Sequence, residues 1–208
     1  MISLLLLGLA SAGWQEDLRP AAAPWDVADR WAMYAAQQDP PLPALACDVL
    51  VPDHVRLCFR TRQGEQLRWV TEADLTAWGA SVEALRKQVT DASRDRAMRP
   101  ETLTIDGMNR SYARWVDGEG WAVAPLLWAQ EIGKQLGPDA RFAVPAGTVA
   151  LAWAAGDGDV DKALAVGVVE LADEQPGEVS RVVFRLDGET LVPFAEATPS
   201  VPAPSEAP

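Results

Sequence analysis

The alternation of apolar and polar positions in the central part of the chain predicts a helix followed by two buried strands. Within residues 125–136 the apolar side chains recur at helical spacing, although Leu127 falls on the polar side. A Gly-Pro pair ends this helix, because proline cannot continue it. Two apolar runs follow, at residues 141–144 and 148–154, with a Pro-Ala-Gly turn between them. We expect these segments to form the centre of the core.

Helical periodicity recurs in four other segments, which are residues 25–38, 71–79, 81–99 and 160–172. Thr71 opens the second of them with a sequence that resembles a capping box, and Ser81 is a suitable N-cap for the third. The residues before the first helix, 13–24, have no such pattern. We expect them to form an exposed lead-in.

Short apolar runs flank turn residues at three further places, which predicts hairpins at residues 45–61, 101–116 and 180–194, with one more strand at 67–70. Strands joined by tight turns pair antiparallel. The sequence therefore predicts an α+β fold, with a mostly antiparallel sheet built from hairpins and three to five helices packed on it. A chain of 208 residues suits a single domain over residues 13–194, and the Pro/Ala-rich residues 195–208 predict a disordered tail.

The first hairpin places the two cysteines of the chain opposite each other. Counting outward from a type I turn at Pro52-Asp53 pairs Val51 with His54 and Cys47 with Cys58. Directly opposite strand residues lie close enough for a disulfide. In the chain-entropy model, closing this loop contributes roughly 3 kcal/mol. The alternative is a pair of reduced, packed cysteines in a cytosolic protein.

The N-terminal residues 1–12, MISLLLLGLASA, have an apolar run and end in the small-x-small pattern of a signal-peptidase site. No lysine or arginine precedes the run, and it is too short to span a bilayer, which takes about 20 residues. We therefore expect a signal peptide, an exported protein in the periplasm or outside the cell, and no transmembrane segment. The alternative is an apolar segment buried in a cytoplasmic protein.

The formal net charge of −12 makes broad attraction to nucleic acid or to an anionic membrane unfavourable. The hairpin at residues 45–61 is an exception, because Arg56, Arg60 and Arg62 share the face of its cysteines, and Arg68 follows on the next strand. We interpret these arginines as a possible site for an acidic partner. The alternatives are contacts with the acidic last third of the chain and simple solvation.

Asp157, Asp159 and Asp161 resemble the first half of a calcium-binding loop. An EF-hand also requires glycine at the sixth position and glutamate at the twelfth, where this chain has Lys162 and Val168. Our main interpretation is that these acids cap the following helix and complement its dipole. A low-affinity calcium site is the alternative.

The sequence contains few residues typical of an active site. His54 is the only histidine, and it lies at a predicted turn, whereas triads and zinc sites need histidine or cysteine together with other ligands or bases. We expect no cofactor. Carboxylate pairs leave no local motif, so they remain open among 30 acidic residues. The nine tryptophans are interpreted as core residues, with a sugar-binding cleft as the alternative.

Three segments carry a resemblance to a known family: VTEADLTAWGASVEAL at residues 70–85, DGEGWAVAPLLW at 117–128 and RFAVPAGTVALAW at 141–153. With the following helix and final hairpin, they make residues 70–194 resemble the YtpQ-like family of uncharacterised bacterial proteins. The resemblance implies an α+β fold and no known activity, cofactor or catalytic residue. The leader, the cysteine pair and the Pro-Ala tail depart from that family, which we picture as cytosolic.

Two functions follow from these observations. The first is an exported, non-catalytic domain that acts by binding a protein or surface partner. The second is a hydrolase that uses a carboxylate pair. A deep cavity with converging acids would favour the enzyme, and an exposed apolar patch would favour binding.

Overall fold

The structure is a computed structural model, and it describes residues 17–105, 110–156 and 158–196. The signal-peptide prediction at residues 1–12 and most of the predicted tail lie outside these ranges. In chain order the described elements are β1 (Arg19–Pro24), α1 (Val27–Ala35), β2 (Cys47–Val51), β3 (Val55–Gln63), β4 (Gln66–Trp69), α2 (Glu72–Trp78), α3 (Val82–Ala97), β5 (Glu101–Ile105), β6 (Arg110–Val116), the 3-10 helix η1 (Trp121–Val123), α4 (Ala124–Leu127), α5 (Ala129–Leu136), β7 (Arg141–Ala146), β8 (Val149–Trp153), α6 (Gly158–Glu174), β9 (Val182–Asp187) and β10 (Thr190–Glu196).

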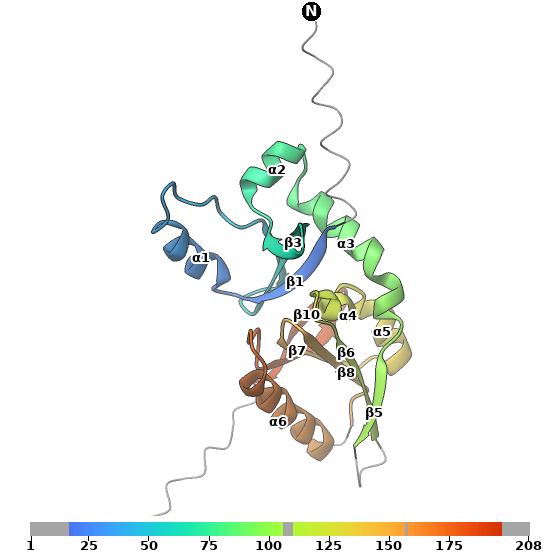
Figure 1. Cartoon of the computed structure of the whole chain (residues 1–208). Coiled ribbons are helices and arrows are strands. Elements are labelled where there is room, and N and C mark those ends of the chain that lie inside the picture. The colour runs from blue at the N-terminus through green and yellow to red at the C-terminus, as the bar shows by residue number, and fades with distance from the viewer. Residues whose placement is uncertain (1–16, 106–109, 157, 197–208) are drawn as a thin grey trace, which may run out of the picture.

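The predicted α+β fold is confirmed, with two antiparallel sheets in place of one. The smaller sheet has the order β1-β3-β2, and β4 also pairs with β3. The larger sheet has six strands in the order β10-β9-β7-β8-β6-β5. Figure 1 shows the smaller sheet with α1 and α2 above the larger sheet. Every helix within the described ranges is too short or too polar to cross a bilayer.

Strand β1 corrects the prediction of an exposed lead-in before the first helix. It pairs with β3 along its whole length, from Arg19 opposite Arg60 to Pro24 opposite Val55. Its segment Pro-Ala-Ala-Ala-Pro lacks the apolar-polar alternation that predicts a strand. Pairing with a strand more than 30 residues away in sequence is what buries it, so no local pattern signals it.

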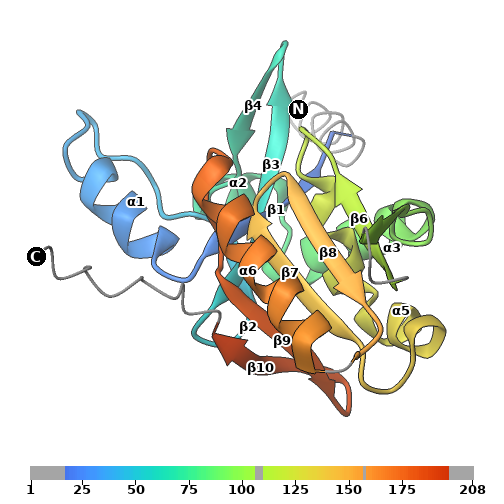
Figure 2. The ribbon, with the colours of Figure 1, turned by 90° about the horizontal axis from the view of Figure 1, so that it is seen from below.

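The central strands β7 and β8 of the larger sheet are buried on both faces. Their successive side chains point to opposite sides and enter two different core clusters. Phe142 and Val144 of β7 belong to the main core cluster, while Ala143 between them belongs to a second cluster. Helix α6 covers that second face, as Figure 2 shows, and buries Leu164 and Val168 against it. The central strands are therefore apolar at nearly every position, as the sequence indicated.

The main core cluster joins the two sheets. It contains Leu57 and Phe59 from β3 together with Phe142 of β7 and Phe184 of β9, all of them fully buried. Helices α3, α4 and α5 close the sides of this cluster. The smaller sheet thus has one face on the shared core and one outer face.

The predicted helix at residues 125–136 is two helices, α4 and α5, separated at Trp128. The backbone of Trp128 has φ −116° and ψ 27°, and its indole N–H donates to the Thr90 carbonyl oxygen (3.0 Å) and to Ser93 Oγ (3.1 Å). The break changes the helical phase, so Leu127 packs against the main core although a continuous helix would have placed it on the polar side. The described chain therefore has six α-helices where five segments were predicted.

The predicted disulfide is confirmed: Cys47 and Cys58 are bonded, and their Cα atoms are 4.1 Å apart. The predicted register holds at this pair and fails near the turn. A register shift after Val49 pairs Val51 with Val55, where His54 was expected. Asp53 has φ +61°, a left-handed backbone that a type I turn at Pro52-Asp53 does not contain.

Candidate binding cleft

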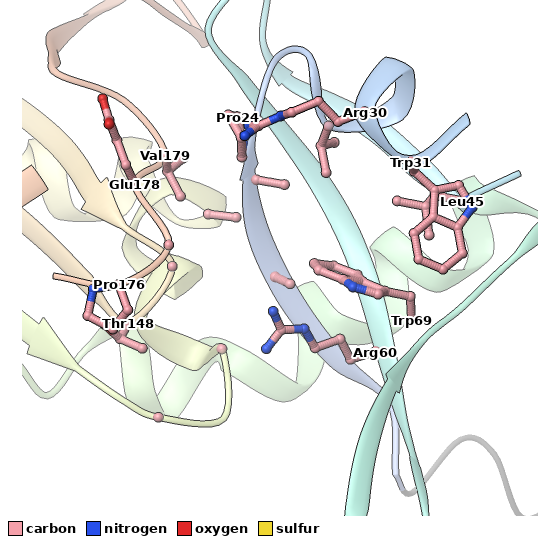
Figure 3. A pocket seen from close by; sticks show the side chains of 18 of the residues that line it. Pro24, Arg30, Trp31, Leu45, Arg60, Trp69, Thr148, Pro176, Glu178 and Val179 are labelled. Atoms are coloured by element: carbon pink, nitrogen blue, oxygen red, sulfur yellow. The ribbon is translucent and has the colours of Figure 1, made fainter. Parts of the chain in front are cut away.

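A cleft of about 620 Å³ lies over the outer face of the smaller sheet. One wall is formed by α1 and by the outer-face residues of β1, β3 and β4. The other wall is formed by loops at one end of the larger sheet, by Gly118 and Gly120 and by residues 147–148 and 176–179. Figure 3 shows side chains from both walls pointing into the space between them.

The floor of the cleft is made of alanines. Ala21 and Ala23 lie on the outer face of β1, opposite Cys58 and Arg56 of β3, and each is 2% exposed. Because these positions carry only methyl groups, the arginines and tryptophans around them enclose a hollow that larger side chains would have filled. The alanines of β1 give no strand pattern in the sequence, and the same small side chains leave the space that forms the cleft.

Helix α1 supplies an aromatic wall. Val27, Trp31 and Tyr34 form the apolar stripe of this helix, and they line the cleft and take no part in the main core. The indole N–H of Trp31 donates to the Pro43 carbonyl oxygen at 2.9 Å, which fixes its ring. Tyr34 stays 52% exposed at the mouth of the cleft.

Arg60 and Trp69 are the residues of β3 and β4 that line the cleft. They are directly paired residues of β3 and β4, and the guanidinium carbon lies 4.3 Å from the centre of the indole ring. Arg60 is half-buried, and this burial lowers the pKa of its guanidinium, which still keeps its charge at neutral pH. Within the described ranges no carboxylate forms a salt bridge with Arg60.

The loops of the larger sheet come close to β1 at two glycines. A Cβ atom at Gly120 would stand 2.2 Å from the Pro20 carbonyl oxygen, and one at Gly147 would stand 3.5 Å from that of Ala22. The loop at residues 176–179 is held beside them, because Val179 N–H donates to the Pro145 carbonyl oxygen at 2.9 Å. The second wall is therefore fixed by backbone contacts.

Among the described residues that line the cleft, Glu178 is the single acid. Its carboxylate accepts a hydrogen bond from Arg181 Nε at 2.7 Å. That hydrogen bond, together with the nearby charges of Arg181 and Arg30, lowers the pKa of Glu178 despite some desolvation. Glu178 is thus held ionised, which is the opposite of what a general acid needs.

The other predicted partner-binding arginines make contacts within the chain. Arg56 stacks on Trp25 at 4.4 Å and donates to its carbonyl oxygen. Arg62 forms a salt bridge with Glu119 at 3.0 Å, and Arg68 forms a two-pronged salt bridge with Asp74. The structure brings Arg60 alone of the four into the cleft.

Of the three aspartates proposed for calcium, the structure describes two, and each of these has another partner. Asp157 lies outside the described residues, and Asp159 is an exposed neighbour of Lys162 at 3.9 Å. Asp161 instead accepts hydrogen bonds from the Trp153 indole N–H (3.1 Å) and from Gly156 N–H (3.3 Å). Across the described ranges no group of three His, Cys, Asp or Glu side chains is arranged to hold a metal ion.

His54 lies at the turn between β2 and β3, as predicted, and its ring packs edge-on against Phe184 at 5.8 Å. Both cysteines are in the disulfide, so neither is available as a nucleophile.

No family model, curated protein or solved structure matches this chain. The resemblance of residues 70–194 to the YtpQ-like family stays a prediction.

The sequence indicated Arg60 as a candidate binding residue but did not indicate the cleft around it. Trp31, Trp69 and Thr148 come from three segments that are distant in sequence, so no spacing connects them. The sequence contained one relevant signal. The apolar stripe of α1 is short, and the Asp-Pro-Pro segment after the helix separates it from the next predicted element.

Proposed function

We propose that the chain is an exported, non-catalytic binding domain, and that its cleft holds an apolar segment of a partner protein. The observation that carries this proposal is the cleft itself, a hollow of about 620 Å³ with aromatic side chains on one wall and backbone-fixed loops on the other. Such concave, mainly apolar sites are the usual place for ligands.

Exposed apolar side chains are also present on α1 and on the loop that follows it. Met33 is 67% exposed and Tyr34 52% exposed, both on α1, and Leu42 on the following loop is 39% exposed. Exposed apolar groups are typical of surfaces that bind another protein. Tyr34 is the one of these three that lines the cleft, and a partner segment in the cleft would contact it.

The alternative function, a hydrolase with a carboxylate pair, needs two carboxyl groups about 5 to 10 Å apart on either side of a substrate. Glu178 is the only acid among the described residues of the cleft, and its lowered pKa does not suit an acid catalyst. This composition favours binding over hydrolysis.

The disulfide supports export as part of the proposal, because such bonds persist in oxidising compartments and are rare in the cytosol. The measurement is an intact mass of the protein recovered from its host. Export predicts loss of residues 1–12 and of two hydrogens from the cysteine pair. A full-length, reduced chain would support the cytoplasmic alternative.

The binding function is tested by selecting a random-peptide phage library on the immobilised protein. Synthetic copies of the selected peptides are then titrated by fluorescence polarisation. Thr148→Trp places a large ring in the cleft and should weaken binding at least about 10-fold, which corresponds to about 1.4 kcal/mol. Val166→Ala, at a 49% exposed position of α6 outside the cleft, is the control and should bind as wild type does.

Two results would contradict this function. One is that the library yields no peptide above background. The other is that the selected peptides bind wild type and Thr148→Trp equally, because they would then occupy another surface.

A further inference from the structure

We propose that the cleft recognises a carboxylate joined to an apolar or aromatic group, with Arg60 as the residue that binds the carboxylate. This inference rests on the proposed binding function and adds the chemical class of the ligand. Figure 3 shows the Arg60 side chain reaching into the cavity beside Trp69.

The charges around the cleft leave one cation to be neutralised. Arg30 lines the cleft but forms a salt bridge with Asp26 at 2.8 Å, and Glu178 forms one with Arg181 at 2.7 Å. Arg60 has a stacking partner and no carboxylate partner within the described ranges. A bound group with one negative charge would therefore complete the site.

The geometry of Arg60 suits a carboxylate. Its guanidinium is held against the ring of Trp69 at 4.3 Å, so little freedom is lost when it binds. The planar fork of arginine matches the two oxygens of a carboxylate, and such paired hydrogen bonds are stronger than neutral ones. A phosphate carries close to two negative charges at neutral pH, which one unpaired arginine would leave partly uncompensated.

The rest of the cleft selects what the carboxylate is attached to. Trp31 and Tyr34 present aromatic surface from α1, and Ala21 and Ala23 form an apolar floor. An aromatic or aliphatic group fits this apolar surface better than a second charged group, which would lose its hydration. The carboxylate can belong to a peptide or to a free aromatic acid, and the test separates the two.

The test uses isothermal titration with two pairs of probes. The first pair is N-acetylphenylalanine and its neutral amide. The second is the peptide Ala-Phe-Ala-Phe with a free C-terminal carboxylate and the same peptide as the amide. The acid should bind about 10- to 100-fold more tightly than the amide, as expected for a charge-assisted pair. A preference in both pairs supports a free acid as ligand, and a preference in the peptides alone supports a peptide.

Variants of two neighbouring arginines provide the control. Arg60→Gln should bind acid and amide equally, and Arg60→Lys should keep only part of the preference because it lacks the fork. Arg62→Gln removes the same charge from the same face of β3, at a residue that does not line the cleft, and should keep the full preference. Thermal unfolding of each variant shows that it is folded.

The outcomes distinguish the carboxylate inference from the proposed binding function. If library peptides bind in the cleft but acid and amide bind wild type equally, the carboxylate inference is wrong and the binding function stands. If Arg62→Gln abolishes the preference as fully as Arg60→Gln does, the assignment to Arg60 is also wrong. If neither the probes nor the library gives a binder, both proposals fail.

Discussion

Gly120 lies with its backbone against the carbonyl oxygen of Pro20, so that a Cβ atom at residue 120 would stand 2.2 Å from that oxygen. The backbone of Gly120 also has φ +101°, a region that favours glycine. The contact joins the loop before η1 to β1, and it brings the two walls of the cleft together at one end.

Gly120→Ala should destabilise the protein by about 2 kcal/mol or more, because it adds backbone strain and a clash with a main-chain atom that cannot rotate away. The measurement is the free energy of unfolding in urea. Gly118→Ala is the matched control, since it lies two residues away with nothing within 4 Å of its Cβ position and should stay within about 0.5 kcal/mol of wild type. Equal effects of the two substitutions would contradict the contact.

Reduction of the Cys47–Cys58 disulfide should lower the free energy of unfolding by roughly 3 kcal/mol, because the unfolded chain regains the entropy of an open loop. Urea unfolding equilibrated with and without dithiothreitol measures the difference. The double variant Cys47→Ser, Cys58→Ser should unfold at one midpoint in both conditions. If the wild-type unfolding midpoint is the same with and without dithiothreitol, the predicted contribution of the disulfide to stability is wrong.

Asp74 should make stability depend on pH. Burial raises the pKa of its carboxyl, but hydrogen bonds from Arg68 and from the backbone and hydroxyl of Thr71 outweigh burial, and the pKa falls below its ordinary value of 3.8. The stabilisation is therefore complete above the unfolded value and is lost as the pH falls through the lower, folded value. Urea unfolding between neutral and acid pH should show a smaller decline for Asp74→Asn than for wild type.

The exposed pair of Lys87 and Asp91 provides the control for this experiment, because its side chains are 77% and 61% exposed. Asp91→Asn should cost about 0.5 kcal/mol or less and leave the acid-induced decline unchanged. The prediction is wrong if Asp91→Asn and Asp74→Asn alter the pH profile to the same extent.

Two buried tryptophans should respond differently to replacement by phenylalanine. The indole N–H of Trp115 donates to the carbonyl oxygens of Arg96 and Ala97, each at 3.2 Å, whereas the buried N–H of Trp121 has no hydrogen-bond partner in the described structure. Trp115→Phe should therefore cost about 1 kcal/mol more than Trp121→Phe. Urea unfolding of both variants measures this difference, and the reverse order would refute it.

Features that depend on neighbouring residues were predictable. Thr71 and Asp74 form the expected capping box, and Ser81 caps α3 through a hydrogen bond from Ala84 N–H. The three predicted hairpins are present, although the turn residues 106–109 lie outside the described ranges. The cysteine pair followed from counting along one hairpin.

Features that depend on distant residues were not predictable. The burial of β1 comes from pairing with β3, the break at Trp128 coincides with hydrogen bonds to α3, and the register shift after Val49 changes the pairing at the turn. None of these leaves a repeating pattern along the chain.

The sequence by itself determined the hairpins, the N-caps of α2 and α3, the apolar centre and the disulfide, because each is decided by residues within one turn or one strand pair. Only the tertiary structure decided that the alanines of β1 lie beneath α1, that Arg60 stacks on Trp69, and that loops of the larger sheet face them. A cleft is a space left between segments that pack from distant parts of the chain. Its position therefore depends on how those segments are brought together, which no local spacing records.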